Sequence, residues 1–228
     1  MHEPEFREAS ALQTRDAAQD CVPYAPPLWY SVVERLLALF LVMLALPVLA
    51  VLIVLIRRES PGPALFAQDR IAQGGTCSFR FFKLRSMYAD APTRFPELYD
   101  FSFAGKDMAD VKLQWADDPR VTPLGRFLRR SSLDELPNLW NVVTGDMRLV
   151  GPRPELFAML PHYDTRTIRK FAVKPGVTGY AQVLGRGDLN FVDTVELDLR
   201  YVEEAALSTD LRCLVQTVRA ILARDGAH

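Results

Sequence analysis

Residues 131–154 read SSLDELPNLWNVVTGDMRLVGPRP, and this stretch contains a helix start, an apolar stripe and a helix stop. Pro137 is favoured at the first position of a helix because its missing N–H would have no partner there. Gly145 is a typical helix stop. The apolar residues between them recur at helical spacing and form one stripe: Leu136, Leu139, Trp140 and Val143. Asp134 and Glu135 would lie at the amino end of this short helix.

Basic residues lie on both sides of the acidic pair. Arg129 and Arg130 precede it, and Arg153 follows it between two prolines that restrict the backbone. The amino end of a helix attracts anions, and guanidinium groups bind phosphate oxygens in a bidentate fork. An acid among such groups keeps its charge and is available as a nucleophile or metal ligand. The combination indicates phosphoryl chemistry. The ordinary alternative is an N-terminal helix cap with solvated arginines beside it.

The composition excludes several other classes of function. The chain has 228 residues and a formal net charge of −1, so its overall charge does not favour nucleic acid as a partner. Its three cysteines are widely spaced and lack a CxxC pattern, which is typical of reduced thiols in a cytosolic compartment. The histidines are not clustered with them, which argues against a structural zinc site.

A long apolar run extends from Leu36 to Ile56 and is interrupted only by Pro47. Its length is near the ~20 residues that a helix needs to cross a bilayer. We therefore expect a loose tail over residues 1–27 and a membrane-anchoring helix over residues 28–58. A kink is expected at Pro47, because proline removes a backbone hydrogen bond and clashes with the preceding turn.

Basic residues follow this apolar run closely, whereas the tail before it has more acids than bases. The positive-inside rule therefore places the domain formed by residues 59–228 on the cytoplasmic side. A spanning helix and a re-entrant helix bent at Pro47 both satisfy this rule, so the composition alone leaves the topology open.

The fold class expected for the domain is α+β, compact and mostly helical, with a small β-hairpin and amphipathic helices at the membrane interface. Gly74-Gly75 joins two strand-like runs and predicts the hairpin, whose second strand carries Lys83. The other expected segments are a loop with short helical pieces over residues 89–116, a helix over residues 155–170 and mostly helical structure over residues 189–223.

The motifs around the acidic pair resemble those of a known family. SLDELPNLWNVVTGDMRLVGPRPE is similar to the signature of the bacterial sugar transferases, the monotopic phosphoglycosyl transferases. The resemblance includes QDR and FKLRSM upstream, DDPRVTPLGRFLRRSSLDELP in the middle and KPGVTGYAQVLGR downstream, and it covers roughly residues 30–220. The anchor of this family is a re-entrant helix that usually bends at Ser-Pro, where this chain has Leu46-Pro47.

The resemblance implies transfer of a sugar 1-phosphate from a UDP-sugar to polyprenyl (undecaprenyl) phosphate with release of UMP. Such a reaction is the first membrane step in assembling an exopolysaccharide, a lipopolysaccharide, a capsule or another glycoconjugate. Asp134 would form a covalent phosphosugar intermediate, and Glu135 would bind Mg²⁺. The remaining implied contacts are phosphate-binding Lys83, Arg129 and Arg153, and nucleotide-sugar-binding Lys174, Gly176, Gln182 and Arg186.

The same resemblance implies that the protein lies at the cytoplasmic face of the bacterial inner membrane and contacts lipid. A homodimer is one option for its oligomeric state. Two other functions remain compatible with the residues alone. The first is a membrane-anchored hydrolase that cleaves nucleotide sugars with water as the acceptor. The second is a non-catalytic scaffold whose basic residues recognise anionic lipid.

Overall fold

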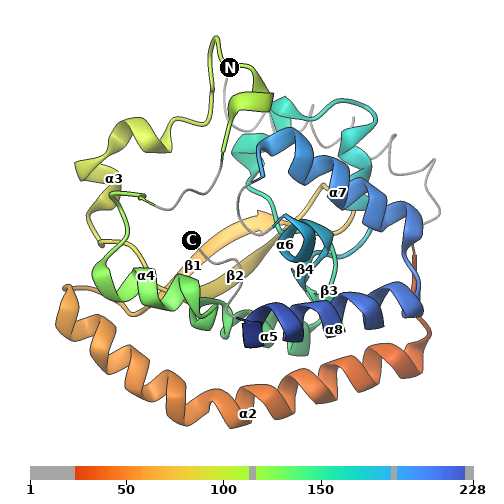
Figure 1. Ribbon diagram of the computed structural model, residues 1–228, viewed down its shortest axis with the longest axis horizontal. Coiled ribbons are helices and arrows are strands. Elements are labelled where there is room, and N and C mark those ends of the chain that lie inside the picture. The colour runs from red at the N-terminus through yellow and green to blue at the C-terminus, as the bar shows by residue number, and fades with distance from the viewer. Residues whose placement is uncertain (1–23, 113–116, 186–188, 224–228) are drawn as a thin grey trace.

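The computed structural model describes residues 24–112, 117–185 and 189–223 and has an α+β fold (Figure 1). One long helix lies along one side of a domain built from short helices and two small sheets. With 3₁₀ helices labelled η, the elements in chain order are α2 (Leu28–Glu59), β1 (Leu65–Ile71), β2 (Ser78–Leu84), α3 (Ala91–Arg94), η1 (Pro96–Tyr99), η2 (Met108–Asp110), α4 (Pro123–Arg130), η3 (Leu133–Glu135), α5 (Asn138–Thr144), β3 (Arg148–Val150), η4 (Phe157–His162), η5 (Thr167–Ala172), β4 (Gly176–Thr178), α6 (Tyr180–Leu184), α7 (Phe191–Glu204) and α8 (Leu207–Ala223).

The predicted N-terminal apolar helix is confirmed as α2, which continues through Pro47 and is bent in Figure 1. Both of its halves touch the domain, because Ala38 packs with the core beside α5 and Leu52 packs with Leu84 and Leu128. Only 17% of its most apolar 18-residue window is buried, whereas the core helix of a soluble protein would be mostly buried. Of the helices described, α2 alone is long and apolar enough to cross a membrane. The re-entrant topology stays a prediction.

A buried group of charged and hydroxyl side chains joins α2 to the domain. Glu34 of α2 accepts hydrogen bonds from the backbone N–H of Leu149 at 2.7 Å and from Nε of Arg148 at 3.3 Å. Nη2 of Arg148 donates to Asp210 at 2.7 Å, and the hydroxyl of Tyr201 donates to the other oxygen of Asp210 at 2.8 Å. We call Glu34, Arg148, Tyr201 and Asp210 the anchor cluster. It fixes the position of β3 against both α2 and α8.

The predicted hairpin is confirmed. Strands β1 and β2 are antiparallel, with Leu65 opposite Leu84, and they are joined through Gly74 and Gly75. These two glycines have φ values of +85° and +73°, in the left-handed region that glycine tolerates best. The hairpin aligns Phe79, Phe81 and Lys83 on one side of β2, and both phenylalanines are buried.

Two other expectations about the domain have different outcomes. The continuous helix expected over residues 155–170 is wrong, because η4 and η5 replace it and residues 163–166 separate them. Pro161 lacks a backbone N–H, and the side chain of Asp164 accepts backbone hydrogen bonds that favour a turn. The helical structure expected over residues 189–223 is confirmed as α7 and α8.

Candidate active site

The acidic pair lies in η3, directly before the short helix that the sequence predicts. That helix, α5, begins after Pro137 and ends at Gly145, whose φ of +88° is typical of a helix C-terminus. η3 follows Ser132, which has a left-handed φ of +54° although it is not glycine. This turn directs Asp134 into the domain, where the residue is only 4% exposed.

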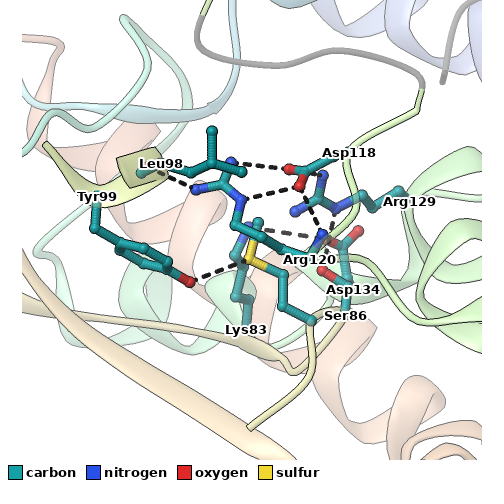
Figure 2. Close-up of polar contacts among 9 residues, drawn as sticks. Lys83, Ser86, Leu98, Tyr99, Asp118, Arg120, Arg129 and Asp134 are labelled. Carbon is teal, nitrogen blue, oxygen red and sulfur yellow. Dashed lines mark hydrogen bonds and ion pairs between the residues drawn. The ribbon is translucent and has the colours of Figure 1, made fainter. Parts of the chain in front are cut away.

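Lys83 of β2 is the nearest cation to Asp134 that the structure describes. Its Nζ lies 3.8 Å from Oδ2 of Asp134, an ion pair longer than a hydrogen bond (Figure 2). Burial lowers the pKa of Lys83 to about 8, although the carboxylate of Asp134 acts in the opposite direction. Burial also raises the pKa of Asp134, and Lys83 offsets part of that increase. The charged form of each of these two side chains is therefore stabilised by the other.

Arg129 approaches the same space from the last turn of α4. Its Nε donates to Oγ of the buried Ser86 at 3.1 Å, and its Nη1 lies 3.7 Å from Oδ2 of Asp118 (Figure 2). Burial lowers the pKa of Arg129 overall, although the carboxylates of Asp118 and Asp134 act in the opposite direction. The hydrogen bond to Ser86 orients the guanidinium without using its Nη groups.

Arg153 completes the group from the loop after β3. Its Nη1 donates to Oε1 of Glu135 at 3.2 Å. Burial lowers the pKa of Arg153, but Glu135 and Asp134 outweigh burial and raise it overall. The loop is held from β1, because Nη1 of Arg70 donates to the carbonyl of Pro154 at 3.1 Å. Lys83, Arg129, Asp134, Glu135 and Arg153 thus form one group, which we call the Asp134 cluster.

A second set of buried charges packs beside the loop that carries Arg153. Nζ of Lys170 lies 3.0 Å from Oδ2 of Asp198 and 3.6 Å from Oε2 of Glu155. The hydroxyl of Tyr163 donates to the same oxygen of Glu155 at 3.1 Å. A small pocket is lined by Arg153, Glu155 and Lys170 together with residues of β1, η5 and the proline-rich loop. The backbone around Arg153 is therefore held on two sides.

Among the residues described, the other predicted contacts have no side-chain hydrogen bond or ion pair with the Asp134 cluster, although the backbone N–H of Gly176 donates to the carbonyl of Pro152, next to Arg153, at 2.9 Å. Lys174 donates from Nζ to the carbonyl of Gly145 at 2.7 Å, at the far end of α5. Gly176 belongs to β4, and a Cβ there would come within 2.0 Å of the backbone nitrogen of Gly151, so the close approach of β4 to the backbone after β3 requires glycine. The amide oxygen and nitrogen of Gln182 are buried and have no hydrogen-bond partner among the residues described. Arg186 lies outside those residues. These nucleotide-sugar contacts stay predictions.

Sequence reasoning missed several residues that hold this site. Arg70 belongs to the QDR motif, for which the sequence indicated no role. Its hydrogen bond to the carbonyl of Pro154 shows that it holds the loop that carries Arg153. Asp118 and Arg120 form a buried pair beside Arg129, with 2.8 Å between Oδ2 and Nη2. The signal was the Asp-Pro-Arg string at residues 118–120. Such short strings are common, so this one did not stand out.

The donor set suits a metal ion that binds together with a phosphate ligand. No group of three His, Cys, Asp or Glu side chains in residues 24–112, 117–185 and 189–223 could hold a metal by itself. Mg²⁺ commonly takes one or two protein carboxylates and completes its shell with water and substrate phosphates. Glu135 fits this pattern, because its side chain is 22% exposed and neighbours Asp134.

The structure combines a long, exposed apolar helix with a buried carboxylate among three cations, and cations of this kind are suited to phosphate oxygens. The sequence pattern of the family described as "Bacterial sugar transferase" matches residues 27–224, and the chain belongs to this family.

Particular relatives have named activities. The chain is 38% identical over 191 residues to the UDP-galactose-lipid carrier transferase of Erwinia amylovora, covering 84% of this chain and 40% of that protein. It is 35% identical over 191 residues to the undecaprenyl-phosphate galactose phosphotransferase of Salmonella typhimurium, with coverages of 84% and 40%. It is 38% identical over 207 residues to the UDP-glucose:undecaprenyl-phosphate glucose-1-phosphate transferase of Caulobacter vibrioides, with coverages of 86% and 71%. The chain spans about two fifths of the length of the first two proteins.

Proposed function

We propose that this protein transfers a sugar 1-phosphate from a UDP-sugar to undecaprenyl phosphate and releases UMP. The observation that carries the proposal is the burial of one carboxylate, Asp134, beside three cations that are suited to phosphate oxygens. The activities named for the relatives supply the substrate classes.

In the first half of the reaction, an Oδ atom of Asp134 attacks the β-phosphorus of the UDP-sugar. A new bond joins the carboxylate to phosphorus, and the bond from that phosphorus to the bridging oxygen breaks. UMP leaves with the bridging oxygen. Lys83, Arg129 and Arg153 would position the phosphoryl oxygens and offset their charge, which is the main task of a protein in phosphoryl transfer.

In the second half, a phosphate oxygen of undecaprenyl phosphate attacks the same phosphorus. The bond to Asp134 breaks, the carboxylate is regenerated, and the product is an undecaprenyl diphosphosugar. Glu135 would hold Mg²⁺ together with the donor diphosphate, and the metal would neutralise charge on the diphosphate and the leaving UMP. Arg153 keeps Glu135 in place through their 3.2 Å ion pair.

The donor dissolves in water and the acceptor is a lipid, so the two meet at the membrane surface. The face of α2 opposite the domain is apolar and exposed, for example at Phe40, Met43 and Val51. Both halves of α2 pack on the domain, which is what a re-entrant helix bent near Pro47 would do. We therefore assign the enzyme to the inner membrane, with the domain on the cytoplasmic face.

The test is UMP release from a panel of UDP-sugars by the full chain in vesicles, with and without undecaprenyl phosphate and with and without Mg²⁺. We expect at most one turnover without the acceptor, sustained turnover with it, and a loss of rate when Mg²⁺ is chelated. Sustained UMP release at the full rate without the lipid would instead identify a nucleotide-sugar hydrolase. No UMP release from any UDP-sugar would overturn the proposed function.

A further inference from the structure

Asp118 is a buried carboxylate next to the Asp134 cluster that the proposed reaction does not use. The residue is 3% exposed. Its Oδ1 accepts from the backbone N–H and Nε of Arg120, at 3.0 and 2.9 Å, and its Oδ2 accepts from Nη2 at 2.8 Å (Figure 2). Burial raises the pKa of Asp118, but these hydrogen bonds outweigh burial and lower it overall. The carboxylate therefore stays ionised and fixed.

Arg120 is itself held at its other end. Its Nη1 donates to the carbonyl of Leu98 at 3.0 Å, and its guanidinium lies over the ring of Tyr99 at 5.2 Å from the centroid. Both contacts come from η1, a segment about twenty residues earlier in the sequence, so Asp118 and Arg120 are fixed to a separate part of the domain (Figure 2). A planar guanidinium held at both ends has little freedom to rotate.

The contact between Asp118 and Arg129 is of another kind. Their closest atoms are 3.7 Å apart, which is beyond hydrogen-bond length. Coulomb attraction falls only as the inverse of distance, so at this separation it still orients a buried guanidinium. Arg120 already donates hydrogen bonds to both oxygens of Asp118. The remaining attraction between Asp118 and Arg129 is therefore too weak to turn the guanidinium of Arg129 away from Asp134.

We propose that Asp118 is a positioning residue for catalysis, which holds the guanidinium of Arg129 beside Asp134. Arg120 donates hydrogen bonds to the carboxylate of Asp118 and so weakens the attraction between Asp118 and Arg129. Arg129 therefore stays available to a phosphoryl oxygen. The assignment of Arg129 as a phosphate ligand rests on the proposed function. Asp118 itself touches no reacting atom.

The first test is Asp118→Asn, which removes the charge and keeps the shape. With the guanidinium of Arg129 misplaced by about 1 Å, kcat is expected to fall about 10- to 100-fold with a smaller change in KM. Asp90→Asn is the matched control, because Asp90 pairs with Arg94 in an exposed ion pair of the same chemical type. That variant should keep the wild-type kcat.

A double-mutant cycle separates positioning from a purely structural role. In an Arg129→Ala background, Asp118→Asn should lower kcat by less than about 2-fold, because its effect is transmitted through Arg129. A full 10-fold or larger loss in that background would overturn the proposal. Should Asp118→Asn fail to fold, Asp118→Glu replaces it in the same cycle, because it keeps the charge and moves the carboxylate relative to the guanidinium of Arg129.

A readout that does not need activity distinguishes failure of this proposal from failure of the proposed function. In protein labelled with ¹⁵N-arginine, the Nε–H resonance that disappears in Arg129→Lys belongs to Arg129. This resonance should shift or broaden in Asp118→Asn and stay unchanged in Asp90→Asn. If it is unchanged in Asp118→Asn, the positioning role is wrong even for an active enzyme. If it shifts while no UDP-sugar is cleaved, the positioning is correct and the proposed function is wrong.

Discussion

The anchor cluster and the Asp134 cluster each contain a buried aspartate, but the contacts in the two clusters differ in length. In the anchor cluster, Asp210 accepts from Arg148 at 2.7 Å and from Tyr201 at 2.8 Å. In the Asp134 cluster, the contact of Lys83 with Asp134 is 3.8 Å, and that of Arg153 with Glu135 is 3.2 Å. Short hydrogen bonds satisfy both oxygens of Asp210, and the longest contact of the anchor cluster is the 3.3 Å hydrogen bond from Arg148 to Glu34. The longer contacts of the Asp134 cluster leave its charged groups able to bind a ligand.

This difference separates a structural cluster from a reactive one. A buried charge with incomplete partners raises the free energy of the folded state, so such an arrangement indicates a site where a ligand will complete it. A cluster whose polar groups are all hydrogen-bonded holds secondary-structure elements together, and it has few free donors or acceptors for a substrate. Changes in the Asp134 cluster should therefore affect activity more than stability, and changes in the anchor cluster should do the reverse.

The largest effect is expected for Asp134→Asn. The amide cannot form the bond to phosphorus, so UMP release should fall by at least about 10³-fold, as is usual when a nucleophile is removed. The covalent adduct formed from a UDP-sugar labelled in the sugar should disappear from the denatured protein. Asp146→Asn is the control, because Asp146 is exposed just after α5. An adduct that persists in Asp134→Asn would assign the nucleophile elsewhere.

In the anchor cluster, Asp210→Asn should lower the free energy of unfolding by about 3 kcal/mol, because it leaves Arg148 buried with one of its two carboxylates removed. The midpoint of thermal unfolding in detergent micelles measures this change. Glu196→Gln breaks the exposed ion pair with Arg166 and should leave the midpoint unchanged. Equal midpoints for both variants would show that the anchor cluster is not structural.

The pH dependence of kcat/KM, which reports ionisations of the free enzyme, should reflect Lys83. Its pKa of about 8 means that the ammonium is charged below that pH and is lost above it, so kcat/KM should fall on the alkaline side near pH 8. Lys83→Arg keeps the charge at higher pH and should move this fall upward by at least one pH unit, with a lower maximum. Lys106→Arg, at an exposed lysine, should leave the profile in place. An unmoved alkaline limb in Lys83→Arg would exclude Lys83 as its source.

The smallest effect is expected at Ser132, which begins the turn that carries Asp134. Ser132→Ala and Ser132→Gly both remove the hydroxyl, but only glycine adopts the left-handed φ of +54° without strain. The alanine variant should be less stable than the glycine variant by about 1 kcal/mol, measured by thermal unfolding. Equal stabilities would mean that the backbone at Ser132 carries no strain.

Local features of the sequence predicted many elements correctly. Pro137 and Gly145 delimit α5, and Gly74-Gly75 closes the hairpin, because these residues act on the backbone beside them. The apolar stripe on α5 is only partly buried, since Trp140 is 48% exposed. Helical spacing says which residues share a face, but the width of the buried part depends on what packs against it.

Arg129 and Arg153 were expected near the acidic pair because they flank it in the sequence, whereas Lys83 was expected there only through the family resemblance. Periodicity alone left Lys83 as a charge on an amphipathic strand. The structure brings these residues together because β2, α4 and the loop after β3 meet at η3. Asp118, Arg120 and Arg70 were overlooked as supports because each acts on a residue distant in the sequence.

The sequence by itself determined the apolar helix, the hairpin, the short helix after the acidic pair and the family, since each depends on residues adjacent or regularly spaced along the chain. Only the tertiary structure decided which charges are satisfied and which are left incomplete. That outcome depends on differences of about 1 Å in the distances between side chains from separate elements, and such distances are set by the packing of the whole domain.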